Sequence, residues 1–203
     1  MSKFQIILDT AMCALWITTY TLVLIGSIRY RYPLISPITQ AIIAPFEFSA
    51  LCLFIKLNSF RLDYASIAYL YWTVIEIVII GVFIRDGYIK KKHIVPYSSM
   101  VLLITAVMIW RVTVKGHMFL YSYINTFIGV IIWLLYIARN KNYPMKSISL
   151  ILFITKLTAD LFAIPVYFGN GTWLENSVCI LLPTVDVCFI ALYFLRKRNK
   201  KVF

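Results

Sequence analysis

The chain has 203 residues, of which 62% are hydrophobic and 14% charged, and its formal net charge is +12. A soluble globular domain is roughly half apolar, so this composition excludes an ordinary soluble domain and favours a membrane protein. The basic residues gather in the connections between apolar stretches, which is typical of membrane topology, so we expect no nucleic acid among the partners.

Seven stretches of the sequence are apolar over about 20 residues, the length that a helix needs to cross a bilayer. In chain order they are 5–28, 38–57, 64–84, 94–112, 118–138, 147–167 and 175–195. The connections are short, so consecutive helices are expected to run antiparallel. The sequence therefore predicts an all-α fold: a polytopic membrane protein whose seven-transmembrane-helix bundle forms a single domain over residues 1–203.

The charge of the connections predicts the orientation of this bundle. With the N-terminus outside, the inner connections and the C-terminal tail carry 14 of the 20 basic residues and the outer segments carry 5. The positive-inside rule then selects an N-out, C-in, multi-pass integral membrane protein, in the plasma membrane if the chain is bacterial. The basic tail 196–201 is expected to contact anionic lipid headgroups.

The second stretch, 38–57, carries Glu47 between Phe46 and Phe48. A charged carboxylate at bilayer depth costs several kcal/mol unless it is protonated, paired or faces a polar cavity. No cation lies one turn before or after Glu47, so the acid must be neutral or paired with another helix. A neutral carboxylic acid in an apolar chamber suits a general acid, whereas the alternative is a structural hydrogen bond between helices.

The third stretch, 64–84, places Trp72 and Glu76 four residues apart, on the same face of the predicted helix. The indole N–H would hold a hydrogen-bond acceptor, or the ring would line a substrate pocket. The sequence favours neither a functional nor a structural role for this pair.

The last two stretches each carry an aspartate. Lys156 precedes Asp160 by four residues, so their side chains share a helix face and are expected to neutralise each other. Asp186 has no cation nearby along its own helix, and if it faces Glu47 the two acids share one proton, which fixes one of them as a donor. Four acids from four helices predict an internal polar chamber.

Aromatic residues make up 16% of the chain, and several of them lie inside the predicted spans. Ring faces attract cations, so a chamber with a protonated acid and aromatic walls suits the guidance of a carbocation; the alternative is packing against lipid and other helices. The candidate substrate-binding residues are Phe46, Phe48, Trp72, Asp160 and Phe189. The sequence has no Gly-rich phosphate loop and no His/Cys metal cluster, so we expect no cofactor and no metal.

Three of these elements together resemble a known family. The aromatic–Glu–aromatic element at Glu47, the Trp-x-x-x-acid element that ends at Glu76 and the late Asp186 are similar to those of the PaxB-type integral-membrane terpene cyclases of fungal meroterpenoid and indole-diterpene pathways and their bacterial relatives. The chain departs from the family's usual pattern in having Phe46 in place of Trp and Glu76 in place of Asp.

The resemblance implies a metal-independent enzyme that starts polyene cyclisation of a lipophilic prenyl or polyprenyl substrate by protonation. It further implies that Glu47 and Asp186 deliver the proton to a terminal epoxide or alkene, with Glu76 in the third-helix position. These three are therefore the candidate catalytic residues.

Two other classes of function remain open at this stage. Four buried acids would also serve as the proton relay of a small proton-coupled transporter, although no internal repeat supports a transporter built from duplicated halves. A lipid-modifying or accessory membrane protein is the third possibility. A transporter would show pH-dependent flux across liposomes, a hydrolase would release a lipid headgroup with water, and an accessory protein would co-purify with a stoichiometric partner.

Overall fold

The computed structural model describes residues 3–57, 64–115, 118–169 and 172–199, and within them the chain forms seven α-helices and no strand. The helices are α1 (Lys3–Tyr30), α2 (Pro37–Leu57), α3 (Tyr64–Arg85), α4 (Lys91–Lys115), α5 (Met118–Arg139), α6 (Ser147–Tyr167) and α7 (Trp173–Asn199). The all-α fold is confirmed. The largest difference at a helix start is at α4, predicted from residue 94, because its first turn continues through charged residues that apolar counting leaves out.

Five of the described helices are long and apolar enough to cross a membrane. They are Phe4–Tyr30, Ile67–Arg85, Lys91–Trp110, Ser147–Tyr167 and Asn176–Arg198, and shorter apolar stretches occur at Pro37–Leu53 and Ile124–Arg139. Large apolar side chains also face outward, among them Val95, Leu102 and Leu103 of α4, each more than 60% exposed. An apolar surface of this extent suits lipid rather than water.

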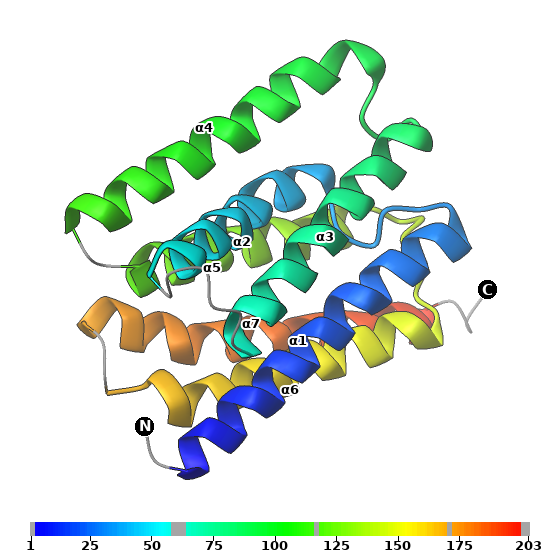
Figure 1. Ribbon diagram of the computed structural model, residues 1–203. Coiled ribbons are helices and arrows are strands. Elements are labelled where there is room, and N and C mark those ends of the chain that lie inside the picture. Colours follow the sequence, from blue (N-terminus) through cyan, green and yellow to red (C-terminus); the bar gives the residue numbers. More distant parts are fainter. Residues whose placement is uncertain (1–2, 58–63, 116–117, 170–171, 200–203) are drawn as a thin grey trace.

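The helices pack as a bundle with α4 at its edge (Figure 1). Helix α1 lies along α6 and also contacts α3, while α2 packs against α3, α4 and α5. Helix α7 joins the bundle through α5 and α6. Helix α4 contacts mainly α2, so the interior is formed by the other six helices.

The start of α2 is fixed by local sequence. The Ser36 hydroxyl oxygen accepts a hydrogen bond from the Thr39 backbone N–H at 3.0 Å, which satisfies one of the unpaired N–H groups of the first turn. Pro37 follows as the first helical residue, where its missing N–H costs nothing. The helix that begins here carries Glu47 at its middle.

Helix α5 approaches α2 closely because Gly129 lacks a side chain. A Cβ at this position would lie only 2.6 Å from Ile43 Cγ1, so a larger residue would force the helices apart. The Asn125 side-chain amide donates to the Ile42 carbonyl oxygen and ties the same two helices together. These contacts hold α5 against the half of α2 that precedes Glu47.

The end of the bundle near the α1–α2 connection is closed by aromatic side chains. The Trp133 indole N–H and the Tyr143 hydroxyl both donate to the Leu34 carbonyl oxygen, at 2.7 and 2.8 Å. The Tyr32 ring packs against those of Tyr136 and Tyr143, with centroids 6.4 and 5.9 Å away. Buried Tyr and Trp groups of this kind need polar partners, and the connection supplies them.

Candidate functional site

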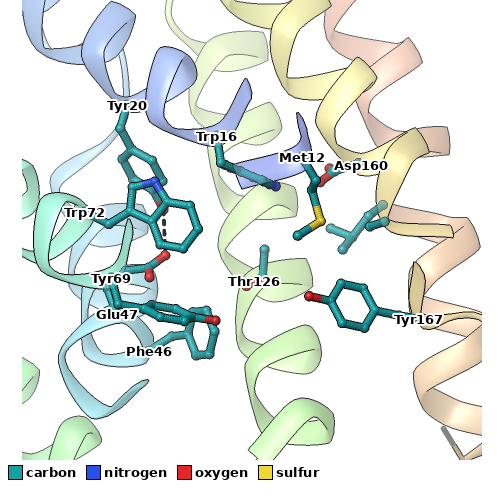
Figure 2. A pocket seen from close by; sticks show the side chains of 12 residues that line it. Met12, Trp16, Tyr20, Phe46, Glu47, Tyr69, Trp72, Thr126, Asp160 and Tyr167 are labelled. Atoms are coloured by element: carbon teal, nitrogen blue, oxygen red, sulfur yellow. Dashed lines mark hydrogen bonds between the residues drawn. The ribbon is translucent and has the colours of Figure 1, made fainter. Parts of the chain in front are cut away.

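A cavity of about 100 Å³ lies between the six helices other than α4 (Figure 2). Its wall combines aromatic rings, two carboxyl groups and a few small or apolar side chains. The lining residues are Met12, Trp16, Tyr20, Phe46, Glu47, Tyr69, Trp72, Thr126, Asp160, Ala163, Tyr167 and Leu182.

The cavity lies toward the end of the bundle that carries the N-terminus. Met12 comes from the first half of α1, Tyr69 from the second turn of α3, and Tyr167 is the last residue of α6. The Tyr167 hydroxyl donates to Asp9 Oδ1 at 3.0 Å, which ties this end of α6 to the start of α1. The opposite end is the one closed by the tyrosines described above.

Glu47 presents a carboxyl group with one unsatisfied oxygen to the cavity. The Tyr20 hydroxyl donates to Glu47 Oε1 at 3.4 Å, a long hydrogen bond. The other oxygen, Oε2, is buried and has no hydrogen-bond partner in the part of the chain that the structure describes, and the residue is only 4% exposed. No described ion pair involves Glu47. The neutral acid is therefore the form that this environment favours.

Glu76 lies behind this acid rather than on the cavity wall. It is fully buried, and neither carboxyl oxygen meets the geometric criteria for a hydrogen bond with any described residue. It interacts electrostatically with Glu47 and with the Tyr20 hydroxyl. We refer to Tyr20, Glu47 and Glu76 as the acid cluster. Trp72, on the same helix as Glu76, lines the cavity.

A second buried cluster joins α6 and α7. Lys156 Nζ lies 2.8 Å from Asp160 Oδ2 and 2.5 Å from Asp186 Oδ1, and all three residues are at most 3% exposed. We refer to these three residues as the ion cluster. The predicted pairing of Lys156 with Asp160 is confirmed, and Asp160 lines the cavity.

The expected meeting of Glu47 with Asp186 is not what the structure shows. Among the described contacts, Asp186 forms no hydrogen bond with Glu47. Its Oδ1 accepts a hydrogen bond from Lys156, and its Oδ2 has no hydrogen-bond partner among the described residues. It is also absent from the lining of the cavity. The counter-ion of Asp186 comes from α6, so an inspection of its own helix could not find it.

Trp16 connects the two clusters. Its ring centroid lies 5.9 Å from that of Tyr20 and 5.3 Å from Lys156 Nζ, the second distance being within cation–π range. In Figure 2, Glu47 lies with Tyr20, Phe46, Tyr69 and Trp72 on one side, and Asp160 lies with Tyr167 on the other. The cavity therefore runs from an acid without a cation to an acid paired with one.

Of the other candidate substrate-binding residues, two line the cavity and two do not. Phe46 and Trp72 line it, and each packs edge-on against Tyr69, with ring centroids 6.0 and 5.0 Å apart. Phe189 instead packs in the core against Trp133 and Phe153, and Phe48 is half-buried on α2 outside the lining.

Sequence reasoning missed the contribution of α1. Met12, Trp16 and Tyr20 follow one another at intervals of four residues, so they form one stripe along the helix. This spacing was a visible signal that one face of α1 carries aromatic residues inward. Tyr69 and Tyr167 gave no comparable signal, because each lies near a helix end where interfacial tyrosines are common.

No family model matches the chain, and no curated protein or solved structure is found to be similar to it. The features that bear on function are therefore those of the cavity itself. Among the described residues, no group of three or more His, Cys, Asp or Glu side chains is placed to hold a metal ion. The wall of the cavity combines a buried carboxyl group that forms no described ion pair, six aromatic rings and a carboxylate paired with Lys156.

Proposed function

We propose that this protein is a multi-pass membrane enzyme, N-out and C-in, that cyclises a prenyl or polyprenyl substrate by protonating it. The observation that carries the proposal is the Glu47 carboxyl group, which is buried with no ion pair to any described residue and lines a cavity whose wall includes six aromatic rings. An uncharged acid of this kind is a proton donor, and the rings favour a positive charge that develops beside it.

The proposed reaction starts with transfer of the Glu47 proton. The O–H bond of the acid breaks while a new bond forms from the proton to a terminal alkene carbon or an epoxide oxygen. The resulting cation is attacked by the next double bond. The final cation then gives a proton back to the Glu47 carboxylate, which leaves a cyclic isomer of the substrate and restores the acid. In this proposal the Tyr20 hydroxyl, 3.4 Å from Glu47 Oε1, orients the acid, and Glu76 takes part through its electrostatic interaction with Glu47.

Asp186 has a different part in this proposal from the one that the sequence resemblance implied. Because it binds Lys156, it is not placed to donate a proton in the cavity. It acts as a positioning residue, since Lys156 in turn holds Asp160 on the cavity wall.

The size of the cavity limits what it encloses. Pockets for drug-sized ligands measure roughly 300–1,000 Å³, and this one is about 100 Å³. In the proposal it therefore takes up the reacting end of the substrate, while the rest of a lipophilic chain lies between helices or in lipid. Apolar walls keep water away from the cation before the rings close.

The test is the variant Glu47→Gln, which keeps the shape of the side chain and removes the proton. Membranes containing the full chain are incubated with linear prenyl alkenes and their terminal epoxides, and products are screened by mass spectrometry for cyclic isomers. We expect Glu47→Gln to lower product formation about 100-fold or more, the usual contribution of a general acid. The wild-type protein is the reference at equal expression.

The two phenylalanines beside Glu47 provide a matched control. Phe46→Leu removes a ring from the cavity wall, whereas Phe48→Leu removes one outside it. Product should fall with Phe46→Leu and persist with Phe48→Leu. Undiminished turnover by Glu47→Gln, or no cyclic isomer from wild-type protein with any substrate of the panel, would overturn the proposal.

A second candidate function is supported by the ion cluster. Lys156 with two carboxylates in the interior, one of them on the cavity wall, resembles the charged groups of a proton-coupled transporter. Such a protein would drive pH-dependent flux of a solute across liposomes without chemical change in the solute. The acid cluster, which forms no ion pair within the described part of the chain, favours the cyclase.

A further inference from the structure

We infer that the cavity binds a small organic ammonium group of about the size of trimethylammonium, held between aromatic faces and the Asp160 carboxylate. This binding follows from the charge and shape of the wall and does not require that the protein be a cyclase.

The aromatic part of the wall is suited to a cation. The six rings come from Trp16, Tyr20, Phe46, Tyr69, Trp72 and Tyr167, which lie on four different helices. Aromatic faces are electron-rich, and quaternary ammonium groups are recognised by cages of several aromatic side chains. One ring of the wall already contacts a cation: Lys156 Nζ, which does not line the cavity, lies 5.3 Å from the centroid of the Trp16 ring.

The polar part of the wall lacks positive charge. In the ion cluster, two carboxylates share the single ammonium of Lys156, so one negative charge is in excess when all three groups are ionised. Asp160 brings this excess to the cavity surface. At the other end, Glu47 Oε2 is buried on the wall with no hydrogen-bond partner in the described part of the chain. A cationic guest in the cavity places its positive charge close to both carboxyl groups.

The volume restricts the guest to a few heavy atoms. At about 100 Å³ the cavity is too small for a drug-sized ligand, yet it suits a compact group with methyl substituents that contact the rings. A phosphate on the same guest would be repelled by the Asp160 carboxylate. This repulsion distinguishes an ammonium guest without a phosphate from the zwitterionic headgroup of a choline lipid.

The wild-type full chain in maltoside micelles, free of choline lipids, is sufficient for the first test. Calorimetric titration compares choline, its uncharged carbon isostere 3,3-dimethylbutan-1-ol, and phosphocholine. We expect saturable binding of choline and binding at least about tenfold weaker for the other two, because only choline retains the cation–π and carboxylate attraction without repulsion. Equal binding of choline and its neutral isostere, or no saturable binding of choline, would overturn the inference.

A pair of substitutions places the binding in this cavity. Asp160→Asn and Asp186→Asn each leave Lys156 with one carboxylate, but only Asp160 lines the cavity. Choline affinity should fall about tenfold with Asp160→Asn, which removes the carboxylate on the cavity wall together with the excess negative charge. It should fall by a smaller factor with Asp186→Asn, which removes the excess charge but keeps that carboxylate. An equal loss in both variants would contradict the assigned position.

Failure of this inference and failure of the proposed function give different results. Choline binding without cyclic products would leave the ammonium site standing and remove the cyclase. Cyclic products that depend on Glu47, with no choline binding, would leave the cyclase standing and remove the ammonium site.

Discussion

The acid cluster and the ion cluster are built from the same kind of residue and differ in what surrounds it. Glu47 and Glu76 are buried beside a tyrosine hydroxyl and no described ion pair includes them, whereas Asp160 and Asp186 share Lys156. The first arrangement favours uncharged acids that are able to give up a proton, and the second favours fixed charges. Burial alone therefore does not define the role of a carboxyl group in this bundle; its nearest cation does.

The largest expected effect on stability comes from removing Lys156, the cation of the ion cluster. Lys156→Met would leave Asp160 and Asp186 as two buried carboxyl groups without a counter-ion, which typically costs about 3–5 kcal/mol. We expect this loss in the free energy of unfolding, measured by denaturant titration in mixed micelles. The matched control is Arg85→Met, which breaks an ion pair with Asp86 whose Arg side chain is 60% exposed, and it should cause no measurable change.

A triple variant separates loss of charge balance from loss of packing. Lys156→Met combined with Asp160→Asn and Asp186→Asn leaves no ionised group in the cluster, so most of the stability should return. If the triple variant is no more stable than Lys156→Met alone, the ion cluster does not have the charge balance described here.

The acid cluster should respond with much smaller changes. Glu76 is fully buried and its carboxyl oxygens lack hydrogen-bond geometry with every described neighbour, so Glu76→Leu removes a group whose burial is costly. We expect the free energy of unfolding to stay within about 1 kcal/mol of wild type or to rise. A loss as large as that of Lys156→Met would show that Glu76 has a strong partner and that the two clusters are alike.

Much of the fold could be predicted from the sequence, because long apolar stretches between charged connections leave little choice but helices. Local spacing also identified one contact inside the site: Lys156 and Asp160, four residues apart, form the predicted ion pair. The interval of four also placed Trp72 and Glu76 on the same side of α3, although only the first reaches the cavity.

The remainder of the site depends on which face of each helix points inward. A helix that is apolar all round has no polar face to indicate its orientation, so Phe189 and Phe48 could not be separated from Phe46 by sequence alone. The partner of Asp186 lies on a neighbouring helix, 30 residues earlier in the chain, and only the packing of α6 against α7 brings them together. Contacts within one helix were predictable here, while contacts between helices were not.

The smallest expected effect on stability comes from the Tyr20 hydroxyl, which forms the described hydrogen bond within the acid cluster. Tyr20→Phe keeps the ring on the cavity wall and removes the hydrogen bond to Glu47, which at 3.4 Å is long. We expect a loss of only about 0.5 kcal/mol in the free energy of unfolding, at the lower end for a hydrogen bond. Because the ring remains, choline affinity should be unchanged, whereas the proposed cyclisation should slow severalfold as Glu47 loses its orienting partner. If both functions change equally, the hydroxyl contributes to the shape of the cavity rather than to the acid, and the two clusters would differ less than their contacts indicate.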